Sequence, residues 1–105
     1  MAKSKLTGFT ENEIELSELA KALAHPARIR ILNILFDSNL CMTGDIVDQL
    51  PLSQSTVSQH LAELKRVGLI KGEIEGPKTC YCLDNKLVRS AKKMLNNLFS
   101  KICNC

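Results

Sequence analysis

The spacing of apolar residues changes twice along this chain of 105 residues, and those changes limit the folds that it can adopt. Apolar side chains recur at helical intervals between residues 10 and 68, partly alternate over 69–83, and return to helical intervals over 85–102. Turn residues at 76–78 divide the alternating stretch into the two strands of a hairpin. The sequence therefore predicts a mainly α-helical fold with one small β-hairpin and a long last helix.

Capping residues divide the first helical stretch into four helices. Thr10 and Glu13 form a capping box at the first, and Pro26 suits the first turn of the second. Thr43 and Ser53 can cap a short third helix and a fourth. The apolar content of the second helix predicts that it is nearly buried. Two short helices joined by a tight turn and followed by a hairpin are the plan of a winged helix-turn-helix.

Length, charge and hydropathy limit the class of protein. A chain of 105 residues makes one domain, and its 45% hydrophobic content allows a core. We assign residues 1–9 to a flexible N-terminal tail and residues 10–105 to a winged helix-turn-helix domain that binds DNA and dimerises. The net charge of +3 permits nucleic-acid binding without demonstrating it. Because the sequence shows neither a signal peptide nor a membrane-spanning run, we expect a cytoplasmic protein whose five cysteines are thiols.

The fourth expected helix has the two faces that a DNA-reading helix needs. Val57, Leu61 and Leu64 recur at helical spacing and predict a buried face. Short polar side chains fill its first two turns, and they can approach base edges and phosphates closely. A polar face that meets only solvent is the alternative, but the place of this helix just before the hairpin favours DNA reading. The predicted DNA-contacting residues are Gln54, Ser55, Thr56, Ser58 and Gln59.

The hairpin would lie along the adjacent groove of the DNA. Lys71 and Lys78 are predicted to lie near phosphates there, where they would position the protein without reading sequence. Ordinary solubilising charge explains these two lysines equally well.

The last expected helix carries an apolar stripe that a thin domain cannot cover alone, and such a stripe usually marks an interface. We therefore predict a homodimer through this helix, with the first helix assisting. Two-fold symmetry would place two DNA-reading helices about one DNA turn apart on a palindromic operator. The stripe comprises Leu87, Val88, Ala91, Met94, Leu95, Leu98, Phe99 and Ile102.

Three segments between Leu23 and Leu83 carry a family resemblance: LAHPARIRILNIL, DIVDQLPLSQSTVSQHLAELKRVGLIKGEIEG and the hairpin strand that follows. The serine-rich stretch that ends in His60 and Leu61, ahead of the glycine-leucine-isoleucine at 68–70, is the most specific part. Together they resemble the ArsR/SmtB family of metal-responsive regulators. The resemblance implies a homodimeric transcriptional repressor that sits on double-stranded operator DNA and leaves it when a metal or metalloid binds.

The chain departs from the known inducer sites of that family. Many arsenic and cadmium sensors carry C-V-C-D-L on the helix before the DNA-reading helix. Aligned on Asp45, those two cysteines fall at Met42 and Gly44, and Cys41 lies one residue away. Zinc sensors of the family use Asp and His on the last helix, but residues 85–102 contain no His. The first site is therefore absent or altered, and the second is absent.

The cysteines include two C-x-C pairs. Cys80 and Cys82 are two apart on an expected strand, so both side chains point to one face and could share a soft ion. Packing of two small apolar side chains under the hairpin, which is the wing of this fold, is the alternative. Cys103 and Cys105 follow the last core residue, which favours ligation or redox chemistry over packing. For Cys41, at a helix start, a packing role is favoured and a third-ligand role is the alternative.

The predicted inducer is a thiophilic metalloid, As(III) or Sb(III), with Cd(II) and Zn(II) as other thiophilic candidates. Cys80 and Cys82 would supply two thiolates. The third would come from Cys103 or Cys105 of a partner chain, because the long last helix carries these residues away from their own hairpin. We expect DNA binding itself to need no cofactor. His25 is predicted to be structural, and so is His60.

Two other functions remain open from the sequence. One is a redox-sensing repressor of the same fold whose cysteines oxidise. The other is a winged-helix module that binds proteins instead of DNA. An enzyme is not expected, because no Ser/His/Asp set, carboxylate pair or glycine-rich phosphate loop stands out.

Overall fold

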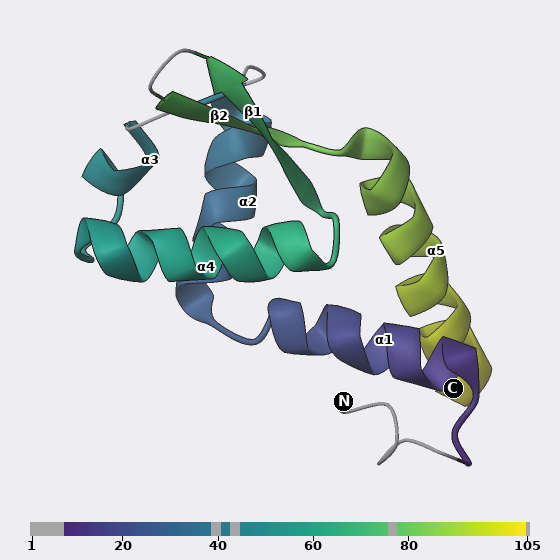
Figure 1. The fold of residues 1–105 in the computed structure, drawn as a ribbon. Coiled ribbons are helices and arrows are strands. Elements are labelled where there is room, and N and C mark those ends of the chain that lie inside the picture. Colours follow the sequence, from purple (N-terminus) through teal and green to yellow (C-terminus); the bar gives the residue numbers. More distant parts are fainter. Residues whose placement is uncertain (1–7, 39–40, 43–44, 76–77, 105) are drawn as a thin grey trace.

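The computed structural model describes residues 8–38, 41–42, 45–75 and 78–104. The order of helices around one antiparallel hairpin confirms the winged helix-turn-helix predicted from the sequence (Figure 1). The expected cap at Thr43 lies outside the described residues. The elements are α1 (Glu11–Ala22), α2 (Pro26–Ser38), α3 (Asp45–Asp48), α4 (Gln54–Arg66), β1 (Ile70–Glu75), β2 (Lys78–Leu83) and α5 (Asn85–Ile102).

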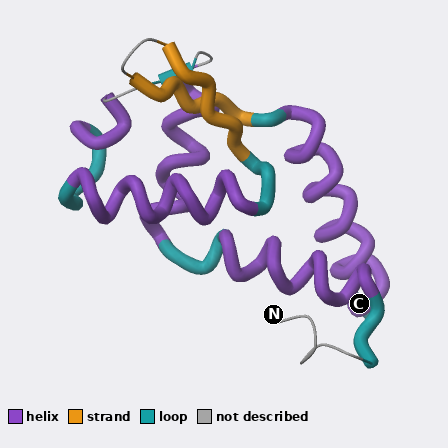
Figure 2. Tube along the Cα trace, viewed as in Figure 1, coloured by secondary structure: helices purple, strands orange, loops and turns teal. Residues whose placement is uncertain are grey.

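The core lies between α2, α3, α4 and the hairpin. Its fully buried side chains come from each of these elements. Figure 2 shows the hairpin at one end of the molecule, with α1 and the far end of α5 at the other. α4 is held against the core along its apolar face, which leaves the opposite face outside. The largest fully buried side chains are Ile31, Ile46, Val57, Leu64 and Ile70.

Local sequence explains where these helices begin and end. Thr10 Oγ1 accepts a hydrogen bond from the Glu13 N–H at 3.1 Å, and the Thr10 N–H donates to Glu13 Oε1 at 2.9 Å. The predicted capping box is therefore confirmed. The Asp84 carboxylate accepts from the Lys86 N–H at 3.1 Å and so caps α5. Gly68 follows the C-cap of α4 with a φ of 86°, a left-handed conformation that favours glycine.

A short extended segment ahead of α3 lies beside the hairpin. The Met42 N–H donates to the Tyr81 carbonyl oxygen at 2.8 Å, and the Tyr81 N–H donates to the Met42 carbonyl oxygen at 2.7 Å. β2 is thus paired on both edges, with β1 on one side and this segment on the other. Nothing in the sequence pattern predicts this bridge, because a single bridging residue leaves no alternation of apolar side chains.

Parts of α2 and α5 remain uncovered in a single chain. The expectation that α2 is nearly buried is wrong, because only one side of the helix faces the core and Ile29 and Phe36 are exposed. On α5, Phe99 and Ile102 are 60% and 59% exposed. The radius of gyration is 15.4 Å, against about 13 Å for a compact domain of this length. Within the described ranges, no helix combines the length and apolarity needed to cross a membrane.

Candidate functional site

α4 has the two faces that the sequence predicts. Val57, Leu61 and Leu64 are buried in the core. The polar residues of its first two turns lie on the outside, where a DNA-contacting side chain must be. That these side chains touch DNA stays a prediction. Among them Thr56 is half-buried, and the exposed ones are Gln54, Ser55, Ser58 and Gln59.

The Ser53 hydroxyl organises the start of α4. Ser53 Oγ accepts a hydrogen bond from the Thr56 N–H at 3.4 Å and donates to Thr56 Oγ1 at 3.0 Å. Ser55 Oγ lies 3.3 Å from the same hydroxyl. Two of the predicted DNA-contacting side chains are therefore held by the cap of the helix, which limits the freedom that they would lose on binding.

Two histidines and Arg28 fix α4 to the helices behind it. The Arg28 Nε–H donates to Nδ1 of the buried His60 at 3.0 Å, and Arg28 Nη1 donates to the Lys21 carbonyl oxygen at 3.1 Å, near the end of α1. The centroids of the His25 and His60 rings lie 4.3 Å apart, and His25 Nδ1 accepts a hydrogen bond from the Ala27 N–H at 2.9 Å. Both histidines thus make structural contacts. Burial lowers the pKa of His60, and the charges of His25 and Arg28 lower it further.

Acidification is expected to destabilise the domain through His60. The ordinary pKa of 6.5 applies to the unfolded chain, and the folded value lies below it. Between the two values the unfolded state binds more protons, so the free energy of unfolding falls as the pH drops below 6.5. Protonated Nδ1 also ceases to accept from Arg28. Urea unfolding at about pH 7.5 and about pH 5.5 measures the loss, and His60→Gln should show a smaller one. An equal loss in His60→Gln would exclude His60 as its source.

The wing lysines are only partly placed. Lys71 on β1 is exposed and pairs in register with Cys82 on β2. The backbone of Lys78 pairs with that of Glu75, but its side chain lies outside the described residues. Contact of either lysine with phosphate stays a prediction.

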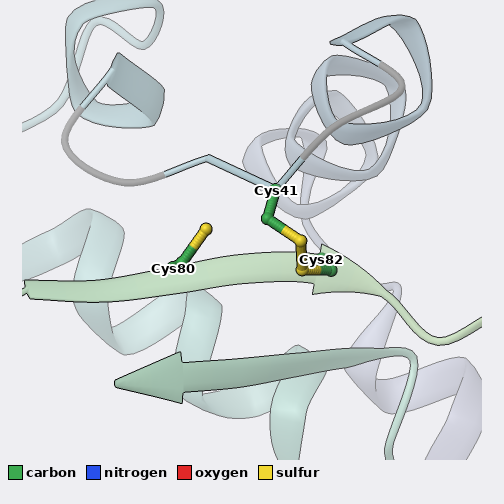
Figure 3. Close-up of side chains that lie close together, drawn as sticks. All are labelled: Cys41, Cys80 and Cys82. Carbon is green, nitrogen blue, oxygen red and sulfur yellow. A yellow bond between two sulfur atoms is a disulfide. The ribbon is translucent and has the colours of Figure 1, made fainter. Parts of the chain in front are cut away.

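Three cysteines come together where β2 meets the segment ahead of α3, and they form what is called below the cysteine cluster: Cys41, Cys80 and Cys82 (Figure 3). Their Sγ atoms all lie within 4.8 Å of one another. Cys80 and Cys82 are 6% and 9% exposed, whereas Cys41 is exposed. The predicted common face of the C-x-C pair on this strand is therefore confirmed, and its third neighbour is Cys41.

Strand register explains why Cys41 meets Cys82. Met42 and Tyr81 exchange both backbone hydrogen bonds, so the next pair, Cys41 and Cys82, occupies a non-hydrogen-bonded position. Side chains come closest at such positions, where Cα atoms are about 4.5 Å apart. The two Cα atoms lie 4.4 Å apart, and a disulfide joins the side chains. The expectation that all five cysteines are thiols is thus wrong for this pair, while Cys80 stays outside the bond.

The C-terminal pair lies elsewhere. Cys103 is the exposed C-cap of α5, and Cys105 lies outside the described residues. Over the described part of a single chain, only Cys41 joins Cys80 and Cys82 in a group that could hold a metal ion. A third sulfur from the C-terminal pair of a partner chain stays a prediction. The one sequence signal for Cys41 was its place one residue from an aligned ligand position.

Comparisons with known proteins agree with this fold. The family model described as "Bacterial regulatory protein, arsR family" matches residues 25–71. The transcriptional activator HlyU of Vibrio cholerae is 35% identical, over 93% of this chain and 90% of its own. The transcriptional repressor PagR of Bacillus anthracis is also 35% identical, over 87% of this chain and 97% of its own.

The solved structure of a relative has the same fold. The structure of HlyU from Vibrio cholerae covers 88% of this chain and 99% of its own, with a TM-score of 0.67 and 33% identity. These relatives are named as regulators of transcription, one an activator and one a repressor, which agrees with the expectation that this chain is not an enzyme.

Proposed function

Because the chain belongs to the ArsR family of bacterial regulatory proteins, we propose that it is a repressor that leaves its operator when a thiophilic metalloid binds the cysteine cluster. The family makes it a DNA-binding regulator of transcription. Repression, the ligand and the ligand-binding residues are the proposal. The observation that carries it is the gathering of three cysteine sulfurs between the helix-turn-helix and the wing.

The cluster suits a soft ion. In a tetrahedral zinc–thiolate site with Zn–S bonds of about 2.3 Å, neighbouring sulfurs lie about 3.8 Å apart. The Sγ atoms here lie within 4.8 Å of one another, so small side-chain rotations would bring them to ligating distance. Thiolates favour soft ions over hard ones. The disulfide must first be reduced, because only the thiolate form of a cysteine is a ligand.

The number of sulfurs favours a metalloid. As(III) and Sb(III) bind three thiolates in a pyramid, and the cluster offers three sulfurs from one chain. Structural zinc sites are almost always four-coordinate, so Zn(II) or Cd(II) would need a fourth ligand from elsewhere. We therefore favour As(III) or Sb(III) as the inducer, with Cys41 as the third ligand in place of the C-terminal pair.

The position of the cluster provides a route from ligand to DNA. Cys41 lies just ahead of α3, the first helix of the helix-turn-helix, whereas Cys80 and Cys82 lie on the wing. Three ligands on one ion would fix the distance between the start of the helix-turn-helix and the hairpin. If operator binding needs a different distance, ligand binding would lower the affinity for the operator. Such an effect of one ligand on the affinity for another is what defines allostery.

The homodimer is part of the same proposal. α5 contacts α1, and an apolar groove of about 410 Å³ lies between α1, α2 and α5. Leu23 and Phe36 line this groove with Leu95, and Phe99 lies exposed one turn beyond. A second copy of the chain would cover these surfaces and pair the two α4 helices for a palindromic operator.

Arsenite titration of the reduced protein on labelled operator DNA tests the proposal. We expect the wild-type protein to release DNA and to bind one arsenic per chain by elemental analysis. Cys41→Ser, Cys80→Ser and Cys82→Ser should bind the operator normally and lose the release, because each removes one of three ligands. Antimonite, cadmium and zinc titrations rank the ions.

Cys103→Ser separates the two possible sources of the third sulfur. Normal release by this variant, with loss in Cys41→Ser, supports the cluster within one chain. The reverse pattern would return the third ligand to the C-terminal pair. Release by both Cys80→Ser and Cys82→Ser at the wild-type arsenite concentration would refute the cluster as the inducer site.

A further inference from the structure

We propose that Cys41 and Cys82 form a reversible redox pair, and that their oxidation by a hydroperoxide closes the metalloid site. The inference rests on the proposed function for the identity of that site, but formation of the bond can be tested without any metalloid. A disulfide uses two of the three sulfurs of the cluster, and Cys80 alone cannot hold a three-coordinate ion. The response to metalloid would then depend on the redox state of the cell.

Strand geometry selects one pair among the three cysteines. Cys41 and Cys82 face each other across a non-hydrogen-bonded position with Cα atoms 4.4 Å apart, inside the usual disulfide range. Cys80 and Cys82 are second neighbours on one strand, and a rise of about 3.3 Å per residue puts their Cα atoms near the upper limit of that range. Cys80 lies diagonally across from Cys41, not directly opposite it. A single pairing is therefore expected.

The difference in exposure predicts that Cys41 reacts first with the oxidant and that Cys82 then forms the disulfide. Cys41 is the exposed residue of the pair, so we expect a small oxidant to meet it first, whereas Cys82 is 9% exposed. The backbone bridge between Met42 and Tyr81 holds the two segments together independently of the sulfurs. Because the bridge can persist after reduction, the thiols would stay in place for the next oxidation or for ligand binding.

The chemistry balances with one hydroperoxide. The Cys41 thiolate attacks one oxygen of hydrogen peroxide and breaks the O–O bond, which gives a sulfenic acid at Cys41 and one water after protonation. The Cys82 sulfur then attacks the sulfenic sulfur, the S–S bond forms, and the hydroxyl leaves as a second water. Two thiols lose two electrons and two protons, and a cellular dithiol reverses the step.

The cellular setting agrees with a switch. A regulator of transcription works beside the chromosome, in a compartment where thiols are kept reduced. Disulfides there are usually transient and act in catalysis or redox sensing. A bond between the segment ahead of α3 and strand β2 of the hairpin fits that use better than a permanent structural link.

Peptide mapping tests the pair directly. The reduced, desalted full-length protein is treated with hydrogen peroxide, alkylated and digested without reductant. We expect one disulfide-linked peptide pair, Cys41 with Cys82, with Cys80 alkylated. Arsenite binding should be lost in the oxidised protein and restored after reduction and desalting.

Two variants make the result specific. Cys80→Ser should still form the disulfide but lose arsenite binding even when reduced, whereas Cys82→Ser should lose both. A map that places Cys80 in the bond, or finds no bond between Cys41 and Cys82, would overturn the redox pair. Unchanged arsenite binding after full oxidation would overturn the closing of the site. If the reduced wild-type protein bound no arsenite, the proposed inducer would fail, while a mapped Cys41–Cys82 bond would still support the redox pair.

Discussion

Replacing Phe99 with glutamate is expected to split the proposed homodimer and to weaken operator binding by about 10²–10⁴-fold. The effect is large because two linked reading helices gain this factor from the second half-site, and a monomer loses it. Phe99 is 60% exposed in a single chain, so the substitution should leave the fold intact. In the proposed dimer it would bury a charge in an apolar contact, which costs far more than exposure to water.

Asn97→Glu is the matched control for this change. It adds the same charge two residues away on α5, on the opposite side of the helix, where the side chain is exposed. Sedimentation at micromolar concentration gives the oligomeric state, and a mobility shift gives the affinity. A Phe99→Glu protein that stays dimeric and binds the operator as the wild type does would exclude this face as the interface.

Replacing Gln59 with alanine is expected to cost about 1–3 kcal/mol of binding free energy on the operator and much less on random DNA. Gln59 is exposed in the first two turns of α4, on the side away from the buried Leu61. If Gln59 forms two hydrogen bonds with a base, its truncation removes discrimination between the right and the wrong base. The phosphate contacts, which do not depend on sequence, are unaffected. Mobility shifts on the operator and on scrambled DNA of equal length measure the difference.

Lys71→Ala should behave differently from Gln59→Ala. Loss of a phosphate contact weakens binding to all sequences alike and lowers the salt slope by about one unit. Lys101→Ala, which removes the same charge from the far end of α5, controls for net charge. If Gln59→Ala and Lys71→Ala change operator and random DNA by the same factors, the division into base-reading and phosphate-contacting residues is wrong.

The sequence by itself determined the elements and their faces. Helical periodicity placed Val57, Leu61 and Leu64 on the buried side of α4, and caps at Thr10 and Ser53 set where helices begin. Period-two geometry put both cysteines of the C-x-C pair on one face of β2. These features depend on residues within about four positions of one another, and short-range rules describe such interactions well.

Only the tertiary structure decided which segments meet. Cys41 and Cys82 are 41 residues apart, and their contact depends on the register at Met42 and Tyr81. A shift of one residue would turn Cys41 to the other face of the sheet, and no local pattern marks the difference. The contact of Arg28 with His60 is set in the same way, by how α2 packs against α4. Long-range register and packing therefore decided that Cys41 joins Cys80 and Cys82 in one cluster.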